Sequence, residues 1–584
     1  MPHFRNSAGI APAVLLAACT LAACTTTTAP PADVAATDAA TPAGNAVPEA
    51  PPAVVTSAWT ADTLYDLLVG EVAGQRDRLD ASLDAYLRQA RKLRDPALAE
   101  RATRIAWYAR DTQQIREAAT LWADIAPDSP EANANAVMGL IQAGEIEAAE
   151  PQLDRLLARD DTAPVRFNFV VQYAQGAEPE TRHRLADLLA ALSERHAGNA
   201  RLWLARSALA DMDGKPEEAL ALVQHARAIE PDHPGSIEFE GRLLTATGKT
   251  AAARRLLAKG REKFPNERDL RLAYLRVLLA ENRGDLARRE LTDMLARWPD
   301  DGDIALSLAL VEWEAGDPAS AKQRLTDLAE AGYREDECWN YAGRIALSEH
   351  SYEEAAGYFQ NVRGAQFLAA QIQVAYAWQK AGRFSDARTL LAGLRKQAPE
   401  ASTQLFIAES ELLARNQDPD GALLLLNEAL VRDADDHDLR YARAMAAERS
   451  GKLDLVESDL RTIIAALPGN AMALNALGYT LADRTDRLEE ARALIEQALA
   501  LTPDDPAIID SMGWVLFRMG KPEEAVAWLR RAWTLSPDPE IAAHLGEALW
   551  TLGNQREARR IWERARALDP DNAALKRTLE RLRP

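Results

Sequence analysis

The chain has 584 residues, of which 47% are hydrophobic and 6% aromatic, and its formal net charge at pH 7 is −20. A polyanion is a poor match for nucleic acid or for an anionic lipid surface, because both repel negative charge. The composition is rich in Ala, Leu, Glu and Arg, which favour helices, and alternating β-branched runs are almost missing. These features predict an all-α protein.

Residues 1–23 have the layout of a secretory signal peptide. Met1–Ser7 is polar with one cation, and Ala8–Ala23 is apolar and ends in small residues. The apolar run spans 16 residues, which is shorter than the roughly 20 residues that a transmembrane helix needs. No later stretch is long and apolar enough to span a bilayer. We therefore expect the chain to be exported.

The sequence Leu-Ala-Ala-Cys occurs twice in this segment, ending at Cys19 and at Cys24. It resembles the bacterial lipobox, in which lipid is attached to the cysteine and the chain is cleaved just before it. We favour Cys24, because cleavage there leaves a full-length apolar region and no second thiol beside the lipid. Cys19 as the lipidated residue, and an ordinary secretory signal with incidental cysteines, are the alternatives. Thr25 follows Cys24, and by resemblance to enterobacterial sorting this implies transfer to the outer membrane.

Residues 24–58 then form an Ala/Thr/Pro-rich segment with no aromatic residue and no hydrophobic period. Such a segment cannot bury enough apolar surface to offset the entropy of ordering. We expect a disordered linker after the lipidated cysteine. A flexible chain of this length has an end-to-end distance of roughly 30 Å, which would hold a folded body away from a membrane surface.

The rest of the chain repeats with a period of about 34 residues. Four closing prolines, Pro468, Pro503, Pro537 and Pro570, are spaced by 35, 34 and 33 residues. Each unit holds two amphipathic helical patterns, and this pattern is similar to the tetratricopeptide repeat. Between Ala61 and Pro570 the sequence predicts roughly 14 or 15 helical hairpins stacked into a superhelical solenoid.

Small and large residues alternate at fixed places in these units. The first helix carries a glycine, Gly478, Gly513 or Gly546, where a missing side chain lets the neighbouring helix approach. The second helix carries an alanine followed one turn later by a larger residue, such as Trp562 in the last unit. Small and large residues alternate in this way so that neighbouring helices interdigitate.

The regularity of the repeats varies along the chain. Residues 59–329 form degenerate repeats, residues 330–440 show the weakest pattern, and residues 441–570 are well formed. The weaker middle segment is compatible with a bend or a break in the superhelix. A last charged helix within 571–584 resembles the polar cap that ends a solenoid.

No constellation of catalytic or metal-ligating residues rises above background. The histidines are scattered, and the sequence contains no G-x-S-x-G, P-loop or H-E-x-x-H pattern. Cys338 in "EDECWN" has acidic neighbours, which raise rather than lower the pKa of a thiol, so we expect a packed core cysteine. The sequence predicts a non-enzymatic protein without cofactor, metal or small-molecule substrate.

A binding surface is therefore expected on the concave side of the solenoid. By resemblance to tetratricopeptide repeats, fixed positions of the first helix face this groove. In the last three repeats, aromatic residues with an Arg among them have the composition of a binding hot spot. The alternative is that adjacent repeats bury these aromatic side chains. The candidate partner-binding residues are Asn475, Tyr479, Asp510, Trp514, Phe517, Arg518, Glu547 and Trp550.

Two longer segments resemble one specific group of proteins. They begin "TLYDLLVGEVAGQRDRLDASLDAYL" near the start of the body and "NALGYTLADRTDRLEEARALIEQAL" near its end. Both resemble a family of large proteobacterial tetratricopeptide-repeat outer-membrane lipoproteins. The best-understood members are adaptors of a periplasmic carboxyl-terminal processing protease and present cell-wall hydrolases to it. The resemblance implies a lipid-anchored scaffold that faces the periplasm and controls peptidoglycan cleavage.

Two other functions remain as alternatives. The chain could assist the assembly of outer-membrane, secretion or pilus machinery, although such lipoproteins usually carry only a handful of repeats. A hidden enzyme is the third hypothesis, and no stretch outside the repeats is long enough to hold a catalytic domain.

Overall fold

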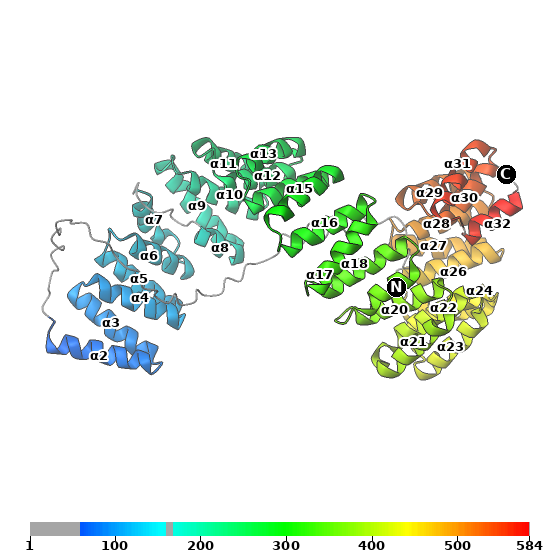
Figure 1. The fold of residues 1–584 in the computed structure, drawn as a ribbon, viewed down its shortest axis with the longest axis horizontal. Coiled ribbons are helices and arrows are strands. Elements are labelled where there is room, and N and C mark those ends of the chain that lie inside the picture. The colour runs from blue at the N-terminus through cyan, green and yellow to red at the C-terminus, as the bar shows by residue number, and fades with distance from the viewer. Residues whose placement is uncertain (1–58, 159–167, 571, 583–584) are drawn as a thin grey trace. The chain divides into compact units, whose positions relative to one another are not determined.

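The computed structural model describes residues 59–158, 168–570 and 572–582. The signal peptide and linker predicted for residues 1–23 and 24–58, with Cys19 and Cys24, lie outside the described residues. Within the described ranges the secondary structure is helical throughout, with 31 α-helices, α2 to α32, and two short 3-10 helices. Figure 1 shows these helices in chain order. The all-α prediction is confirmed.

The described chain divides into two compact units, residues 59–304 and 305–582. The first unit contains seven helical pairs, in which an even-numbered first helix packs against the odd-numbered second helix that follows it. Its helices are α2 (Ala61–Gln75), α3 (Leu79–Leu93), α4 (Pro96–Ala109), α5 (Thr112–Ile125), α6 (Pro130–Gln142), α7 (Glu150–Leu157), α8 (Asn168–Gly176), α9 (Pro179–Arg195), α10 (Ala200–Met212), α11 (Pro216–Ile229), α12 (Pro234–Ala246), α13 (Thr250–Lys263), α14 (Arg268–Ala280) and α15 (Gly284–Arg297), with the 3-10 helix η1 (Glu147–Ala149) before α7.

The second unit contains eight further pairs and one terminal helix. Counted together, α2 to α31 form fifteen pairs, in agreement with the predicted 14 or 15 hairpins. The helices are α16 (Gly302–Glu314), α17 (Pro318–Glu330), α18 (Glu335–Ser348), α19 (Tyr352–Gln360), α20 (Phe367–Lys380), α21 (Phe384–Gln397), α22 (Ser402–Arg415), α23 (Pro419–Arg432), α24 (His437–Arg449), α25 (Leu453–Ala466), α26 (Ala471–Arg484), α27 (Leu488–Leu501), α28 (Pro506–Arg518), α29 (Pro522–Leu535), α30 (Pro539–Thr551), α31 (Gln555–Leu568) and α32 (Ala573–Leu582), with η2 (Pro399–Ala401) before α22.

The turns between paired helices follow from the local sequence. Gly520 and Gly553 end their first helices with φ of +77° and +80°, a left-handed conformation that glycine adopts without steric cost. Proline then occupies the first position of α29, where its missing N–H costs nothing. At the start of α30, the side chain of Asp538 accepts a hydrogen bond from the Glu540 amide. Glycine, proline and aspartate in the loops therefore determine where one helix ends and the next begins.

The first-helix glycines lie directly against the large residues of the second helix. A Cβ atom at Gly546 would lie 2.0 Å from Nε1 of Trp562, and one at Gly513 would lie 2.5 Å from Cγ of Leu529. Trp562 and Leu529 are almost fully buried. The predicted role of the first-helix glycines, close approach of the second helix, is confirmed at both places.

The segment 330–440 lies inside the second unit, and its helical pairs continue without interruption. Its helix α19 has only nine residues. The hydrophobic core of this unit has three parts: one centred on α16 to α20, a small one beneath α20 to α22, and a large one from α22 to the end of the chain. The core is therefore least continuous where the sequence pattern is weakest.

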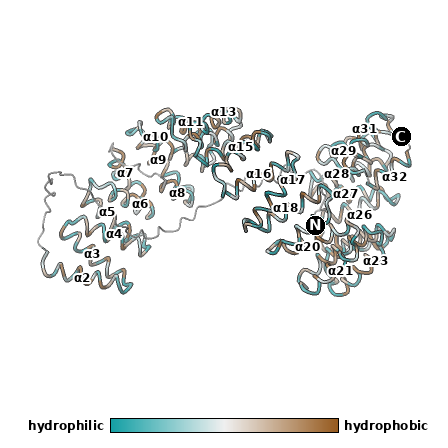
Figure 2. The backbone as a smooth tube through the Cα atoms, viewed as in Figure 1, coloured by the Kyte–Doolittle hydropathy of each residue, from teal (hydrophilic) through white to brown (hydrophobic). Residues whose placement is uncertain are grey.

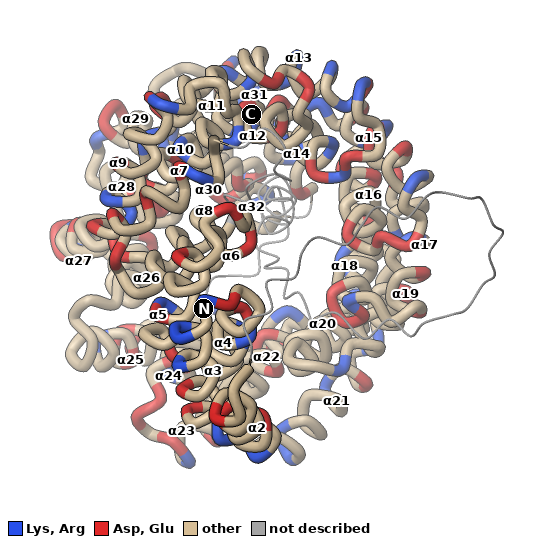
Figure 3. The backbone as a smooth tube through the Cα atoms, turned by 90° about the vertical axis from the view of Figure 1, so that its left-hand side faces the viewer, with Lys and Arg blue, Asp and Glu red and all other residues tan. Residues whose placement is uncertain are grey.

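Hydropathy and charge are distributed as expected for amphipathic helices. Hydrophobic and hydrophilic residues alternate within individual helices of both units (Figure 2). Acidic and basic residues are found on most of the helices (Figure 3). In the part of the chain that the structure describes, no helix has the length and hydrophobicity needed to cross a membrane.

Candidate interaction surface

The predicted binding residues lie on three consecutive first helices, α26, α28 and α30. Helix α26 contacts α28, and α28 contacts α30, so the repeat places their side chains next to one another. We call the side of the stack formed by the first helices the first-helix face. Of the eight residues, α26 carries Asn475 and Tyr479, α28 carries Asp510, Trp514, Phe517 and Arg518, and α30 carries Glu547 and Trp550.

A buried ion pair lies at the centre of this set. Nδ1 of His544 on α30 is 2.8 Å from Oδ2 of Asp510 on α28, and both side chains are about 92% buried. Burial alone would lower the pKa of His544, but the Asp510 carboxylate raises it to about 9. The imidazole is therefore protonated at neutral pH and donates this hydrogen bond. The other carboxylate oxygen of Asp510, Oδ1, is buried without a hydrogen-bond partner among the described residues.

Trp514 packs on this pair instead of projecting into solvent. Its ring stacks on His544 with centroids 4.2 Å apart, and on Phe517 with centroids 5.3 Å apart. Its indole N–H donates to Oδ1 of Asp483 at 3.3 Å. Only 7% of Trp514 is exposed. The sequence left open whether adjacent repeats bury these aromatic side chains. For Trp514 they do.

Tyr479 lies in an acidic environment on α26. Its ring centroid is 6.0 Å from that of His544, and its hydroxyl donates to Oε1 of Glu540 at 3.4 Å. Burial raises the pKa of Tyr479 well above its usual value, and Glu540 and Asp483 raise it further. The hydroxyl is therefore a neutral donor at any physiological pH.

Arg518 fastens neighbouring repeats together. Its Nη1 donates to the backbone carbonyls of Ala482 and Asp483, both at 2.7 Å, at the carboxyl end of α26. A cation there satisfies carbonyls that have no partner within their own helix. Asn475 lies on α26, and its buried Oδ1 atom has no hydrogen-bond partner among the described residues.

The last repeat is covered by the terminal helix α32, which packs on α30. Glu547 is 4% exposed and accepts a hydrogen bond from Arg581 of α32. Trp550 is partly buried, and its ring lies 5.7 Å from Trp562 and 5.3 Å from the Arg559 guanidinium. These two predicted binding residues therefore take part in the contacts that close the stack.

His544 was missed by sequence reasoning, which treated it as one of several scattered histidines. The signal was available, because His544 follows Asp510 by 34 residues, one repeat period. A residue pair separated by one period lies on neighbouring first helices. In a chain with this period, polar residues about 34 positions apart therefore indicate a contact between neighbouring repeats.

No group of three or more His, Cys, Asp or Glu side chains that could hold a metal ion occurs among the described residues. Cys338 is fully buried, and burial together with Glu337 raises the pKa of its thiol to about 12. The predicted packed core cysteine is confirmed, and a thiol in this state is a poor nucleophile.

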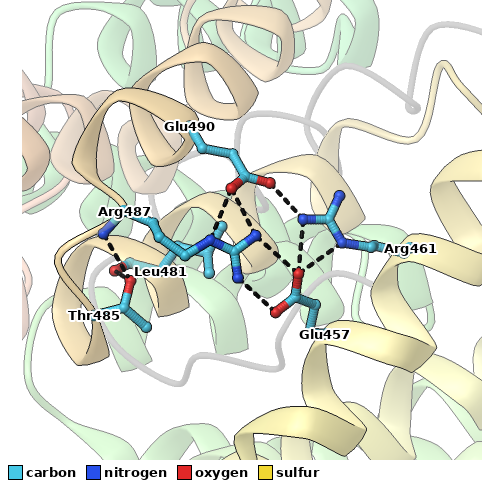
Figure 4. A network of polar contacts seen from close by, with 6 residues as sticks. All are labelled: Glu457, Arg461, Leu481, Thr485, Arg487 and Glu490. Atoms are coloured by element: carbon cyan, nitrogen blue, oxygen red, sulfur yellow. Dashed lines mark hydrogen bonds and ion pairs between the residues drawn. The ribbon is translucent and has the colours of Figure 1, made fainter.

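A charged network joins two second helices of the same region (Figure 4). Glu457 of α25 accepts hydrogen bonds from Arg461 of its own helix at 2.8 Å and from Arg487, at the start of α27, at 2.8 and 3.0 Å. Glu490 completes the ring through both arginines. Arg487 and Arg461 lower the pKa of Glu457 to about 2. The network braces consecutive repeats, and its solvent exposure limits its energetic weight.

Comparison with known proteins places these features among repeat proteins. Tetratricopeptide-repeat models match residues 212–277, 306–366, 441–506 and 511–573. Over 486 residues, which cover 83% of this chain and 82% of its relative, the chain is 38% identical to the TPR repeat-containing protein PA4667 of Pseudomonas aeruginosa.

Two more distant matches cover less. Cellulose synthase operon protein C of Pseudomonas fluorescens is 24% identical over 425 residues, which are 67% of this chain and 33% of that protein. Among solved structures, a thermophilic TPR protein of Thermus thermophilus is 23% identical, with a TM-score of 0.29, over 31% of this chain and all of that one.

Proposed function

Because the chain belongs to the tetratricopeptide-repeat proteins, whose stacked helices bind other proteins, we propose that it is a non-enzymatic, lipid-anchored scaffold of the outer membrane. In this role it faces the periplasm, binds and activates a carboxyl-terminal processing protease, and presents substrates such as peptidoglycan hydrolases to it. Cys24 carries the lipid, and residues 25–58 connect the anchor to the repeats.

One observation carries the proposal: fifteen helical pairs follow directly after a lipobox-like sequence and a linker without hydrophobic period. A stack of this length offers separate surfaces for two partners at once. Holding both partners on one chain raises the effective concentration of substrate at the protease. The anchor keeps this assembly close to the membrane, and the linker lets the repeats turn toward a target.

The first-helix face offers groups that can bind a protein partner. Around Tyr479, His544 and Asp510 it combines aromatic rings, carboxylates and a protonated imidazole. Assistance in outer-membrane or secretion assembly is the second candidate function. It is favoured less, because the number of repeats exceeds what such lipoproteins usually carry.

Affinity purification of the anchored protein from its own cell envelope, followed by mass spectrometry, tests the proposal. We expect a periplasmic serine protease and cell-wall hydrolases to be recovered together. Recovery of neither would refute the adaptor role, and recovery of a secretin in their place would support the second candidate.

The anchor needs its own control. Mass spectrometry of the mature amino terminus should find acylation on Cys24, and Cys24→Ala should release the protein from the membrane fraction. Cys19→Ala is the matched variant and should leave the protein anchored. The reverse result would assign the lipid to Cys19.

A further inference from the structure

Between α18 and α22, the first-helix face of the second unit carries a series of exposed cations. Three exposed cations stand there on consecutive first helices: Arg344 on α18, Lys380 on α20 and Arg415 on α22. None of them has a hydrogen bond or a carboxylate within 4.0 Å among the described residues. Nearby arginines such as Arg324 and Arg395 are paired with buried glutamates. The three cations thus lack the acidic partners that neutralise Arg324 and Arg395.

Aromatic rings hold these cations in place without neutralising them. The Arg344 guanidinium lies between Trp313 and Tyr341, at 6.0 and 5.5 Å from their centroids. Lys380 and Arg415 both lie over Tyr376, at 5.8 and 5.7 Å. A cation over a ring keeps its full charge and remains able to bind an anion. The rings also order side chains that would otherwise lose conformational entropy on binding.

The repeat register places these side chains on the same face as the candidate interaction surface. Arg344 directly follows Gly343, as Tyr479 follows Gly478. Lys380 stands two residues before Gly382, which has a positive φ, as Arg518 stands two residues before Gly520. Contacts also run from one first helix to the next, since Arg344 reaches Trp313 of α16 and Arg415 reaches Tyr376 of α20.

The balance of charge changes along this face. From α24 onward the face carries both signs: Glu448, Asp483, Asp510 and Glu540 raise the pKa of Tyr479, and Arg449, Arg484 and Arg518 stand in the last turns of α24, α26 and α28. Between α16 and α22 the first helices also carry Glu314, Glu335 and Glu411 at exposed positions, and Glu337 of α18 acts on Tyr341 and pairs with Arg334. None of these acids lies within 4.0 Å of the three cations. A bound segment with carboxylates would therefore meet cations without acidic partners at α18 to α22 and a mixture of acidic and basic groups beyond α24.

We propose that Arg344, Lys380 and Arg415, with Trp313, Tyr341 and Tyr376, form a binding site for an extended acidic segment of a protein partner. Carboxylates pair with the cations, and apolar side chains between them contact the rings. Packed helices lie roughly 8–10 Å apart, and an extended chain advances about 3.3 Å per residue. A segment that crosses one first helix after another thus meets a cation about every third residue.

This inference deepens the proposed scaffold function and rests on it for its biological partner, but its test uses defined peptides. The mature chain is titrated into a fluorescent peptide with Glu at every third position and Leu or Ala between, and anisotropy is measured. Peptides with Lys in place of Glu, with shuffled Glu spacing, and with an amidated carboxyl terminus are run beside it. We expect the regularly spaced acidic peptide to bind most tightly, with affinity that falls as salt rises.

The decisive variant is the triple substitution Arg344→Gln, Lys380→Gln and Arg415→Gln. It should weaken binding of the acidic peptide about tenfold to thirtyfold, since three exposed ion pairs of modest strength are lost together. The matched control removes three cations from second helices: Arg255→Gln, Lys259→Gln and Lys396→Gln. Because the net charge change is the same, this control should alter affinity less than threefold.

Single ring variants separate packing from charge. Tyr376→Leu should weaken binding of the acidic peptide, because it removes the aromatic ring. Tyr376→Phe should retain the affinity, because phenylalanine keeps the ring over which Lys380 and Arg415 lie. An equal loss of peptide affinity in the triple variant and in its control would overturn the proposed site. Tighter binding of the Lys peptide than of the Glu peptide would overturn it as well. Loss of affinity on amidation alone would move the assignment from acidic side chains to a terminal carboxylate. Failure to recover protease or hydrolases from the envelope would refute the scaffold function and would leave these peptide results unchanged.

Discussion

The imidazole of His544 and the carboxylate of Asp510 form an ion pair between two consecutive first helices, with Nδ1 and Oδ2 2.8 Å apart. The two residues are one repeat apart in sequence, and Trp514 stacks on the imidazole at 4.2 Å. One contact thus links the charge, the aromatic packing and the register of the carboxyl-terminal repeats.

This pair should make the stability of the second unit depend on pH above neutrality. The folded pKa of His544 is about 9, above the usual value of 6.5. The proton-linked stabilisation is therefore complete below about pH 6.5 and is lost as the pH rises through 9. We expect the free energy of unfolding to fall by about 3 kcal/mol over this window, since the pKa of His544 is raised from 6.5 to about 9. Urea unfolding followed by tryptophan fluorescence between pH 6 and 9.5 measures it.

His544→Gln should remove this slope while lowering stability at pH 6.5, because Asp510 then lacks its buried partner. His183→Gln is the control, since His183 is exposed and lies 3.6 Å from Asp187. It should keep the wild-type slope. An unchanged slope in His544→Gln would contradict the assignment.

Gly546→Ala should destabilise the last repeat. The added methyl group would lie 2.0 Å from Nε1 of Trp562, and the buried indole cannot yield without moving α31. Overpacking of this kind costs about 1–3 kcal/mol. Thermal unfolding monitored by circular dichroism should show a lower midpoint. Gly393→Ala in α21 is the matched control: nothing lies within 4 Å of its added Cβ, so it should be neutral or stabilising.

The network around Glu457 should contribute little and should depend on salt. Its arginines are 44–45% exposed. Glu457→Gln should therefore lower the free energy of unfolding by about 0.5–1 kcal/mol at low salt and by less at 1 M salt. Because the pKa of Glu457 is lowered from 4.5 to about 2, its contribution is present above about pH 4.5 and disappears as the pH falls through 2. If Glu457→Gln instead lowered the free energy of unfolding by several kcal/mol at every salt concentration, this prediction would be wrong.

Cys338 should report unfolding through its reactivity. In a chain that consists of residues 25–584 it is the only thiol, and its pKa is about 12 in a fully buried position. A disulfide reagent such as DTNB should label it at least a hundredfold more slowly in the native protein than in urea. Rapid labelling of the native chain would mean that α18 opens readily.

The repeats were predictable because their signals are local and periodic. The spacing of Pro503, Pro537 and Pro570 marks the ends of second helices, and Gly513 and Gly546 mark the close approach of their partners. Each signal depends on the backbone sterics of proline or glycine within one hairpin, and the positions of these residues can be read from the sequence. The pair count and the all-α class follow from them.

The candidate surface was predictable in position and not in environment. Register placed Trp514 and Glu547 on first helices, but their neighbours come from other repeats: Trp514 stacks on His544, and Glu547 pairs with Arg581 of the terminal helix. Sequence reasoning could not distinguish a projecting aromatic side chain from one covered by the next repeat. The cation series Arg344, Lys380 and Arg415 was likewise hidden, since whether an arginine lacks a carboxylate partner is a matter of distance between helices.

By itself, then, the sequence determined which residues turn, which are helical and which pack glycine against a large side chain, because these choices are settled within a period of about 34 residues. Only the tertiary structure decided which side chains of successive repeats meet. That outcome depends on how far each repeat rotates over the last, a sum of small packing differences that local patterns do not contain.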